Sequence, residues 1–401
     1  PNLRCAHQSC TVKPLRIVQS RPSATYPHTA IRRGFVGRCA WERRGVAIHV
    51  SRPHGAASVS ISGSSGSRSM CMLGSGFVEA ELKAIRSQFP GLQRLADKGV
   101  VLCDGAGGSQ VHASVLNAMN DQLISRNCNL GAPFGNSEDN LVALSQSRED
   151  IATFLNCEAE EVILGNNATT LTFHMARALA SDKALNIGRG DNIVVTAMDH
   201  ACNVGPWEAL ARDTGAQLRR IAFDTQTWTL DETSMTQCID ARTKVVAVGA
   251  ASNLLGSVNN FSRVVELAKE VGAVSYVDAV HLAPHSLIDV QAIGCDMLVC
   301  SPYKFFGPHL GTLYVRREMA LSLTPYKLRP SSDELPSYSN WQGNRWELGT
   351  QNYEGVAGSA AAINYIASLA PPFLADSAED GRSLHRGKEG HSEANRQGNV
   401  G

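Results

Sequence analysis

The sequence predicts an α/β protein built on one large, mostly parallel, seven-stranded sheet with helices on both faces. Seven short apolar runs alternate with amphipathic helical stretches over residues 76–370, which is the pattern of repeated βαβ units. With 401 residues, the chain is long enough to bury a sizeable core. Its 37 Lys and Arg residues equal its 37 Asp and Glu residues in number. We therefore expect no nucleic-acid partner and no attraction to a membrane surface.

The N-terminal residues 1–75 differ from this domain in composition. They are rich in Arg, Ser, Gly and Pro, and Glu42 is their only carboxylate. Such a stretch builds no core, and we predict that it is disordered. It fits an organelle transit peptide, or equally a non-native extension with a natural start at Met70 or Met72.

The C-terminal residues 371–401 are polar and predict a disordered tail. Elsewhere the chain has no run of about 20 apolar residues, which argues against a membrane span.

The eleven cysteines form neither a CxxC pair nor a regular framework, which indicates reduced thiols and no cysteine-based metal site. We expect a cytoplasmic location, or a mitochondrial or plastid one if residues 1–75 are a transit peptide.

The apolar runs and helical patterns place the elements of the domain in order. Strands are expected at residues 100–103, 162–164, 193–196, 218–222, 244–248, 274–277 and 297–300. Helices are expected at residues 137–155, 170–180, 204–212, 262–271 and 355–369. In open α/β sheets, ligands bind beyond the carboxyl ends of the strands. The residues that follow each apolar run are therefore the candidates for function.

The first candidate follows residues 162–164. There the sequence Gly165-Asn-Asn-Ala-Thr-Thr leads directly into a helix. The hydroxyl groups of Thr169 and Thr170, together with the free amides of a helix N-terminus, suit a phosphate dianion. An ordinary N-cap is the alternative interpretation.

Three more strand ends carry polar side chains: His200, Asn253, and the pair Asp278 and His281. A histidine in the place of His200 fits a catalytic role or a hydrogen-bonded structural one. A carboxylate that leaves a buried strand, as Asp278 does, needs a cationic or donor partner. A protonated pyridinium nitrogen, a salt bridge or a helix cap would each satisfy it.

The last candidate is Lys304, in the sequence Ser301-Pro-Tyr-Lys-Phe-Phe. Desolvation among aromatic side chains favours the neutral amine that imine formation requires. A solvated surface lysine is the alternative. The order of groups at successive strand ends, which is hydroxyl, His, Asn, Asp and Lys, favours the functional interpretation.

Four motifs together resemble a known family. They are Phe89-Pro90, Asp104-Gly-Ala-Gly-Gly-Ser-Gln-Val111, Asp278-Ala-Val-His281 and Ser301-Pro-Tyr-Lys304. The chain resembles the class V aminotransferases of the fold-type-I pyridoxal-phosphate enzymes, most of all their cysteine-desulfurase-like subgroup. The resemblance implies pyridoxal 5'-phosphate as cofactor, a small amino acid as substrate and a homodimer.

The resemblance also implies a role for each matching residue. Lys304 would form the Schiff base with the cofactor, Asp278 would pair with its pyridine nitrogen, and His200 would stack on its ring. The implied cofactor-binding positions are Asn253 and His281 near the phenolic oxygen, Thr169, Thr170 and Ser301 at the phosphate, Tyr303 beside the lysine, and Gly349 and Thr350 reaching the phosphate of the neighbouring subunit.

Two of these positions depart from the family pattern. Tyr303 stands where members usually have His, and His281 stands where Gln is common. Both replacements keep hydrogen-bonding groups, so we expect cofactor binding to be retained.

A larger departure is that residues 371–401 hold no counterpart of the family's small domain, with its substrate-binding arginine and nucleophilic cysteine. The expected activity is cysteine-desulfurase-like, a C–S lyase or sulfur-transfer reaction in which Lys304 moves the proton at Cα. The alternatives are another class V reaction, such as aminotransfer, epimerisation or lyase chemistry, and a truncated, inactive cofactor-binding protein.

Overall fold

A computed structural model describes residues 46–51, 58–63, 79–328, 332–336 and 345–369. The chain divides into two compact units, Pro1–Gly76 and Phe77–Gly401. No helix within the described ranges is both long and apolar enough to cross a membrane.

In the first unit, the described residues form one antiparallel strand pair, β1 (Val46–Ser51) and β2 (Ser58–Gly63). The remaining residues of the predicted N-terminal extension, and the whole of the predicted tail at 371–401, lie outside the described residues. The two disorder predictions therefore stay predictions.

The second unit is built on a seven-stranded sheet. Its strands, in spatial order, are β3 (Val162–Gly165), β11 (Gly311–Val315), β10 (Met297–Cys300), β9 (Val274–Asp278), β8 (Thr243–Gly249), β4 (Asn192–Thr196) and β5 (Gln217–Ile221). β11 runs antiparallel to both of its neighbours, and all the other pairs are parallel. The predicted fold class is thus confirmed, with a single antiparallel strand in the sheet.

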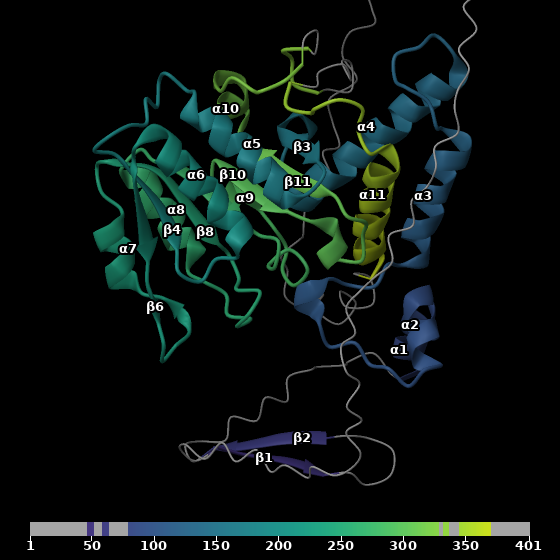
Figure 1. Ribbon diagram of the computed structural model, residues 1–401. Coiled ribbons are helices and arrows are strands. Elements are labelled where there is room, and N and C mark those ends of the chain that lie inside the picture. Colours follow the sequence, from purple (N-terminus) through teal and green to yellow (C-terminus); the bar gives the residue numbers. More distant parts are fainter. Residues whose placement is uncertain (1–45, 52–57, 64–78, 329–331, 337–344, 370–401) are drawn as a thin grey trace, which may run out of the picture. The chain divides into compact units, whose positions relative to one another are not determined.

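Helices cover both faces of this sheet (Figure 1). The long ones are α3 (Ala113–Ser125), α4 (Gly135–Leu155), α5 (Ala168–Ala180), α6 (Gly205–Thr214), α8 (Phe261–Glu270) and α11 (Tyr353–Ser368). The short ones are α1 (Glu79–Ser87), α2 (Pro90–Ala96), α7 (Glu232–Cys238), α9 (Val290–Ile293) and α10 (Arg317–Ser322), and a small hairpin joins β6 (Phe223–Asp224) to β7 (Thr229–Leu230).

The two helical layers follow from the alternation of side chains along each strand. In β4, Val194 packs into a core cluster that includes α4, α8 and α11, whereas Ile193 and Val195 pack into a second cluster with α5 and α6. Successive side chains of a strand point to opposite faces. Because both faces of the sheet are covered by apolar side chains, the strands appear in the sequence as continuous hydrophobic runs, as expected for a buried parallel sheet.

One strand prediction is wrong. Residues 100–103 form no strand, and Val101 is 78 % exposed. The seventh strand is instead β11, which the sequence pattern does not predict because no α-helix separates it from β10. An apolar run becomes a strand only where a neighbouring strand is available for pairing, and residues 100–103 have none.

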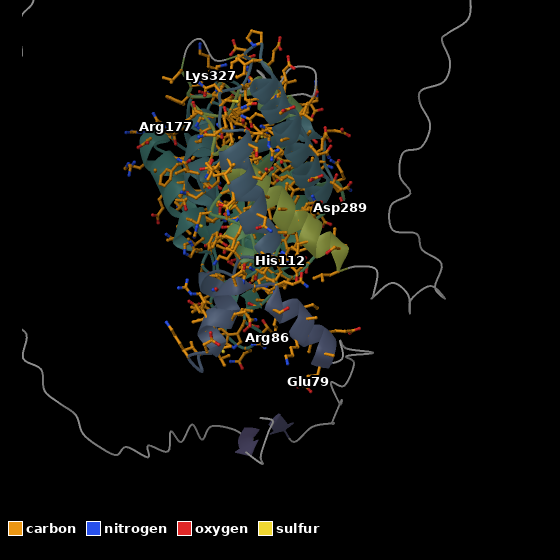
Figure 2. The ribbon with its side chains drawn as sticks, turned by 90° about the vertical axis from the view of Figure 1, so that its right-hand side faces the viewer. Glu79, Arg86, His112, Arg177, Asp289 and Lys327 are labelled. Carbon is orange, nitrogen blue, oxygen red and sulfur yellow. The ribbon has the colours of Figure 1, made fainter. Side chains whose placement is uncertain are left out.

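The segment before α3 packs on the C-terminal half of α11. The ring of His112 stacks on Tyr365 of α11, with centroids 3.7 Å apart, and its Nε2 lies 2.8 Å from Oε1 of Gln88. Burial lowers the pKa of His112, so the ring is held in the neutral form that suits this contact. His112 is labelled beside α11 in Figure 2.

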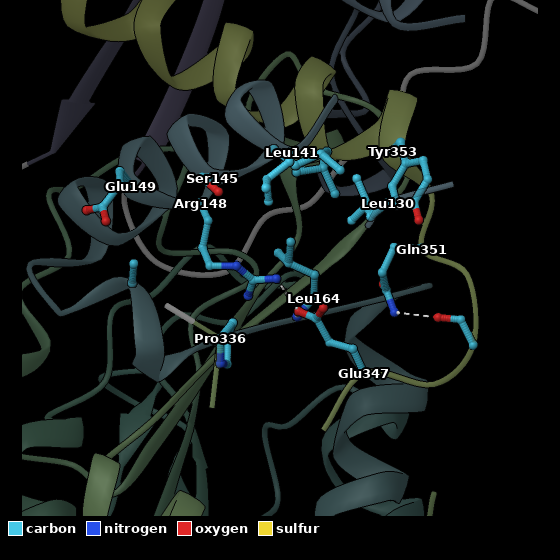
Figure 3. A pocket seen from close by; sticks show the side chains of 14 residues that line it. Leu130, Leu141, Ser145, Arg148, Glu149, Leu164, Pro336, Glu347, Gln351 and Tyr353 are labelled. Carbon is cyan, nitrogen blue, oxygen red and sulfur yellow. Dashed lines mark hydrogen bonds and ion pairs between the residues drawn. The ribbon is translucent and has the colours of Figure 1, made fainter. Parts of the chain in front are cut away.

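A mostly buried ion pair fixes the segment that leads into α11. In α4, the Arg148 guanidinium donates to Oε1 of Glu347 at 2.7 Å and to the carbonyl of Val162 at 2.6 Å. The same Glu347 oxygen accepts the backbone N–H of Leu164 at 3.1 Å. The pair lines a pocket of about 110 Å³ beside α4 (Figure 3). These contacts connect Glu347 to α4 and to β3, which is an edge strand of the sheet.

Breaking this pair should cost much of the stability of the domain. We predict that Glu347→Ala lowers the free energy of unfolding by about 3–5 kcal/mol, because it leaves a buried guanidinium and a buried amide without their acceptor. Urea denaturation of the purified chain measures the effect. Glu266→Ala, which breaks an exposed pair with Arg263, is the control and should cost less than about 1 kcal/mol. Equal small losses in the two variants would contradict the prediction.

Candidate active site

A cavity of about 210 Å³ lies beyond the carboxyl ends of β3, β4, β8, β9 and β10. Among its lining residues are eight that the sequence predicts: Thr169, His200, Asn253, Asp278, His281, Ser301, Tyr303 and Lys304. These residues come from five separate strand ends. The rule that ligands bind at this edge of the sheet therefore brings them together.

The other three predicted residues lie outside this cavity. Thr170 is exposed, and its hydroxyl donates to the carbonyl of Asn167 at 2.9 Å. Gly349 lines the pocket of Figure 3 instead, and Thr350 is exposed. For Gly349 and Thr350 this agrees with the expectation that they serve a neighbouring subunit, which remains a prediction.

Lys304 is buried at the end of a single 3₁₀ turn, Pro302–Lys304, that follows β10. The side chain is 9 % exposed, and its Nζ donates to the carbonyl of Ala106. The Nζ atom also lies 5.0 Å from the centre of the Tyr303 ring. The amine is therefore inside the cavity, in contact with a neutral carbonyl and an aromatic face.

Asp278 is the last residue of β9 and is buried. Its Oδ1 accepts the N–H of Val280 at 2.9 Å, and the thiol of Cys202 donates to its Oδ2 at 3.5 Å. Burial raises the pKa of Asp278, and these hydrogen bonds and the charges of His200 and Lys304 oppose that shift. A cation beside this carboxylate would favour its ionised form.

Asp199 is a second carboxylate of the cavity, and the sequence pattern gives it no role. Its Oδ1 accepts the N–H of Gly249 at 2.6 Å, and its Oδ2 accepts from Nδ2 of Asn203 at 3.1 Å. Burial, followed by the charge of Asp278, raises the pKa of Asp199 to about 7. Its position directly before His200, at the same strand end, is the signal that could have identified it.

Cys202 also lines the cavity without having been predicted. Burial raises the pKa of its thiol well above the usual value, and the negative charge of Asp278 adds to the shift. The thiol therefore stays protonated and acts as a hydrogen-bond donor to Asp278. Thiolates, rather than thiols, are the nucleophilic form, so Cys202 is poorly suited to attack.

His281 brings an unsatisfied polar atom to the site. Its Nδ1 is buried and has no hydrogen-bond partner among the described residues. Burial lowers the pKa of His281, and His285 and Lys304 lower it further. A neutral imidazole with a free nitrogen is left in the cavity wall, ready for an oxygen or nitrogen of a ligand.

These groups fit pyridoxal 5'-phosphate, with an amine for the aldehyde, a carboxylate for the ring nitrogen and an imidazole for the phenolic oxygen. The phosphate would meet Thr169, Ser301 and the first amides of α5, which have no carbonyl one turn back. Within the described ranges, no cluster of three or more His, Cys, Asp or Glu residues could hold a metal ion.

Comparison with known proteins agrees with this geometry. The family model described as Aminotransferase class-V matches residues 101–379. A cysteine desulfurase of Klebsiella pneumoniae subsp. pneumoniae is 31 % identical over 306 residues, which are 74 % of each chain. A cysteine desulfurase of Enterobacter sp. is 33 % identical over 237 residues, 57 % of each chain.

A solved structure shows the same fold. The apo structure of cysteine desulfurase from Thermococcus onnurineus NA1 superposes with a TM-score of 0.64 and 27 % sequence identity, covering 72 % of this chain and 71 % of that one. The matched family model spans well over half of the chain. The chain therefore belongs to the class-V aminotransferase family, in its cysteine-desulfurase-like subgroup, with the large-domain fold of the fold-type-I pyridoxal-phosphate enzymes.

Proposed function

We propose that the chain binds pyridoxal 5'-phosphate and uses it to release sulfur from a small amino acid, with cysteine as the substrate. The observation that carries the proposal is the cavity that holds the Lys304 amine, the buried Asp278 carboxylate and the unsatisfied Nδ1 of His281 together. The names of the relatives, which are cysteine desulfurases, support cysteine as the substrate.

When bound, pyridoxal phosphate supplies an electron-withdrawing ring that accommodates negative charge arising at the substrate Cα. Asp278 keeps the ring nitrogen protonated, because a buried carboxylate stabilises a nearby cation strongly. His200 provides an aromatic face for the ring. Lys304 would hold the cofactor, and its buried Nζ would take and return the proton at the substrate Cα.

The phosphate end of the proposed cofactor site begins at α5. Asn167 caps this helix, since its Oδ1 accepts the N–H of Thr170 at 2.9 Å. The helix N-terminus carries a partial positive charge that favours the dianion. In the proposed homodimer, Gly349 and Thr350 of a second copy complete the phosphate site, and Leu348 beside them is 55 % exposed.

The proposal leaves the attacking thiol of desulfuration unassigned among the described cysteines. Cys202 lines the cavity, but burial and Asp278 keep its thiol protonated, so its role is donation to Asp278. The proposal includes a cytoplasmic location, because the cysteines of the sequence form neither a CxxC pair nor a regular framework.

The first test is covalent attachment of the cofactor. Borohydride reduction of the purified chain with pyridoxal 5'-phosphate should leave a phosphopyridoxyl group on the peptide that contains Lys304, as read by mass spectrometry. Lys304→Ala should lose this adduct, because its amine is the one in the cavity. Lys269→Ala, on the exposed side of α8, should keep it. A stoichiometric adduct in Lys304→Ala would refute the assignment.

The second test separates binding from catalysis. Asp278→Asn keeps the size of the side chain and an acceptor for Val280 N–H, but removes the charge that holds the ring nitrogen protonated. We expect sulfide release from cysteine to fall by roughly 10²–10³-fold, while cofactor affinity changes far less. Modest and equal losses in both quantities would mean that Asp278 is only structural.

The third test uses the pH dependence of stability. The pKa of His281 is lowered in the folded apoprotein, so below about pH 6.5 the unfolded chain takes up a proton more readily and the folded state loses stability. This loss is complete below the folded pKa and absent above the unfolded one. His281→Gln should therefore gain stability relative to wild type as pH falls from about 7 to 5, measured by urea denaturation. If the difference in free energy of unfolding between His281→Gln and wild type stays the same from about pH 7 to 5, the lowered pKa of His281 is ruled out.

A further inference from the structure

The carboxylate of Asp199 joins two strand ends on which the proposed site depends. Its Oδ1 accepts the N–H of Gly249, the last residue of β8, at 2.6 Å. Gly249 lies opposite Asp278 in the β8–β9 pairing, and the next amide, that of Ala250, donates to the Asp278 carbonyl at 2.9 Å. Asp199, the residue before His200, is thus bonded to the end of β8, which pairs with the end of β9 at Asp278.

The Asp199 carboxylate occupies the space that a side chain at residue 249 would need. A Cβ atom on Gly249 would lie 2.4 Å from Oδ1 of Asp199, far inside van der Waals contact. A larger residue at 249 would therefore displace this carboxylate from its hydrogen bond to the backbone of β8.

The second oxygen of Asp199 is held by a chain of donors from the core. Trp207 is fully buried in α6, and its Nε1 donates to Oδ1 of Asn203 at 3.1 Å. Since an indole N–H can only donate, it fixes the orientation of the Asn203 amide. The Asn203 NH₂ group then faces Asp199 and donates to Oδ2 at 3.1 Å.

The hydrogen bonds of Asp199 and Asn203 hold both sides of the turn at His200. The 3₁₀ turn Ala201–Asn203 begins directly after His200, whose Nδ1 accepts the N–H of Cys202 at 3.1 Å. The Cys202 thiol in turn donates to Asp278 at 3.5 Å. The turn is thus tied to β8 through Asp199 and to β9 through Cys202.

We propose that Asp199 is a positioning residue, which fixes His200 relative to Asp278 and thereby shapes the surface that binds the cofactor ring. This inference rests on the proposed function, because it takes His200 and Asp278 to contact that ring. The hydrogen-bond partners of Asp199, which are Gly249, Asn203 and Thr196, are all neutral, and the nearby charge of Asp278 has the same sign as its own. The hydrogen-bond geometry of Asp199, rather than its charge, therefore does the positioning.

Exchanging donor and acceptor tests this directly. Asp199→Asn places an NH₂ group against the NH₂ group of Asn203, so two donors face each other and the contact breaks. The double variant Asp199→Asn/Asn203→Asp restores it. The amide at 199 accepts from Gly249 and donates to the carboxylate at 203, which still accepts from Trp207. Only the location of the charge changes.

The readout is the circular dichroism of the bound cofactor, scaled to the cofactor trapped by borohydride on Lys304. We expect Asp199→Asn to lose most of this ellipticity while cofactor still attaches, and its kcat for sulfide release to fall by about 10²-fold. The double variant should recover most of both. Trp207→Phe removes the N–H that orients Asn203, together with part of a fully buried ring, and should give a smaller loss of the same kind.

Asp296→Asn is the matched control. Asp296 also ties two strands together, because it accepts the N–H and hydroxyl of Ser275 at 2.8 and 2.9 Å, but at the amino ends of β9 and β10. This variant should lower the free energy of unfolding and leave the ellipticity per bound cofactor unchanged. An equal loss of ellipticity would mean that any weakening of the sheet has this effect, which would overturn the proposal.

Two further results would also overturn it. Full ellipticity in Asp199→Asn would show that the contact is dispensable, and a double variant as impaired as the single one would show that Asp199 acts through its charge. If Asp199→Asn does not fold, the double variant and Trp207→Phe decide by the same criteria. An absent adduct on wild-type Lys304 would remove the proposed function as well, whereas a normal adduct with unaffected variants removes only this inference.

Discussion

The parallel pairing of β8, β9 and β10 is the constraint on which the site depends. In this register Gly249 lies opposite Asp278, and Asp278 lies opposite Val299. A slip of one residue would turn every side chain of β9 to the other face and would carry Asp278 out of the cavity. Burial fixes the register, because Val277 belongs to one core cluster and Tyr276 to the other. Packing of apolar side chains thus places the charged ones.

That placement has a cost, since the chain takes carboxylates out of water at the strand ends. Burial raises the pKa of Asp278 and that of Asp199, which means that each would be more stable in the unfolded chain when ionised. The charges of His200 and Lys304 offset this for Asp278 only in part. A ligand that brings a cation to Asp278 would complete the compensation and would stabilise the folded state by its own binding energy. Cofactor binding and fold stability are therefore expected to be coupled at this one residue.

The sequence predicts the parts of this molecule that depend on local patterns. Apolar runs that end at polar residues locate most of the strands. They therefore also locate Lys304 and Asp278, which lie at the strand ends. The sequence does not predict contacts made across the sheet. Asp199 and Cys202 stand beside His200 in the chain, but their partners are Gly249 and Asp278, which lie 50 and 76 positions away. The same limit explains the wrong strand at residues 100–103 and the missed β11, because strand pairing is decided by neighbours that an apolar run does not reveal.

The ion pair of Arg148 and Glu347 extends this reasoning to the proposed dimer. Glu347 is 5 % exposed and is bonded to α4 and β3, whereas the residues directly after it are exposed and Gly349 adopts a φ of 69°. The segment therefore leaves a rigid base and turns outward through a backbone conformation that favours glycine. A loop that completes the phosphate site of a second subunit needs such a base, because an unanchored loop would lose conformational entropy on docking. In the proposed homodimer, Arg148 would thus support cofactor binding in the neighbouring subunit without contacting the cofactor.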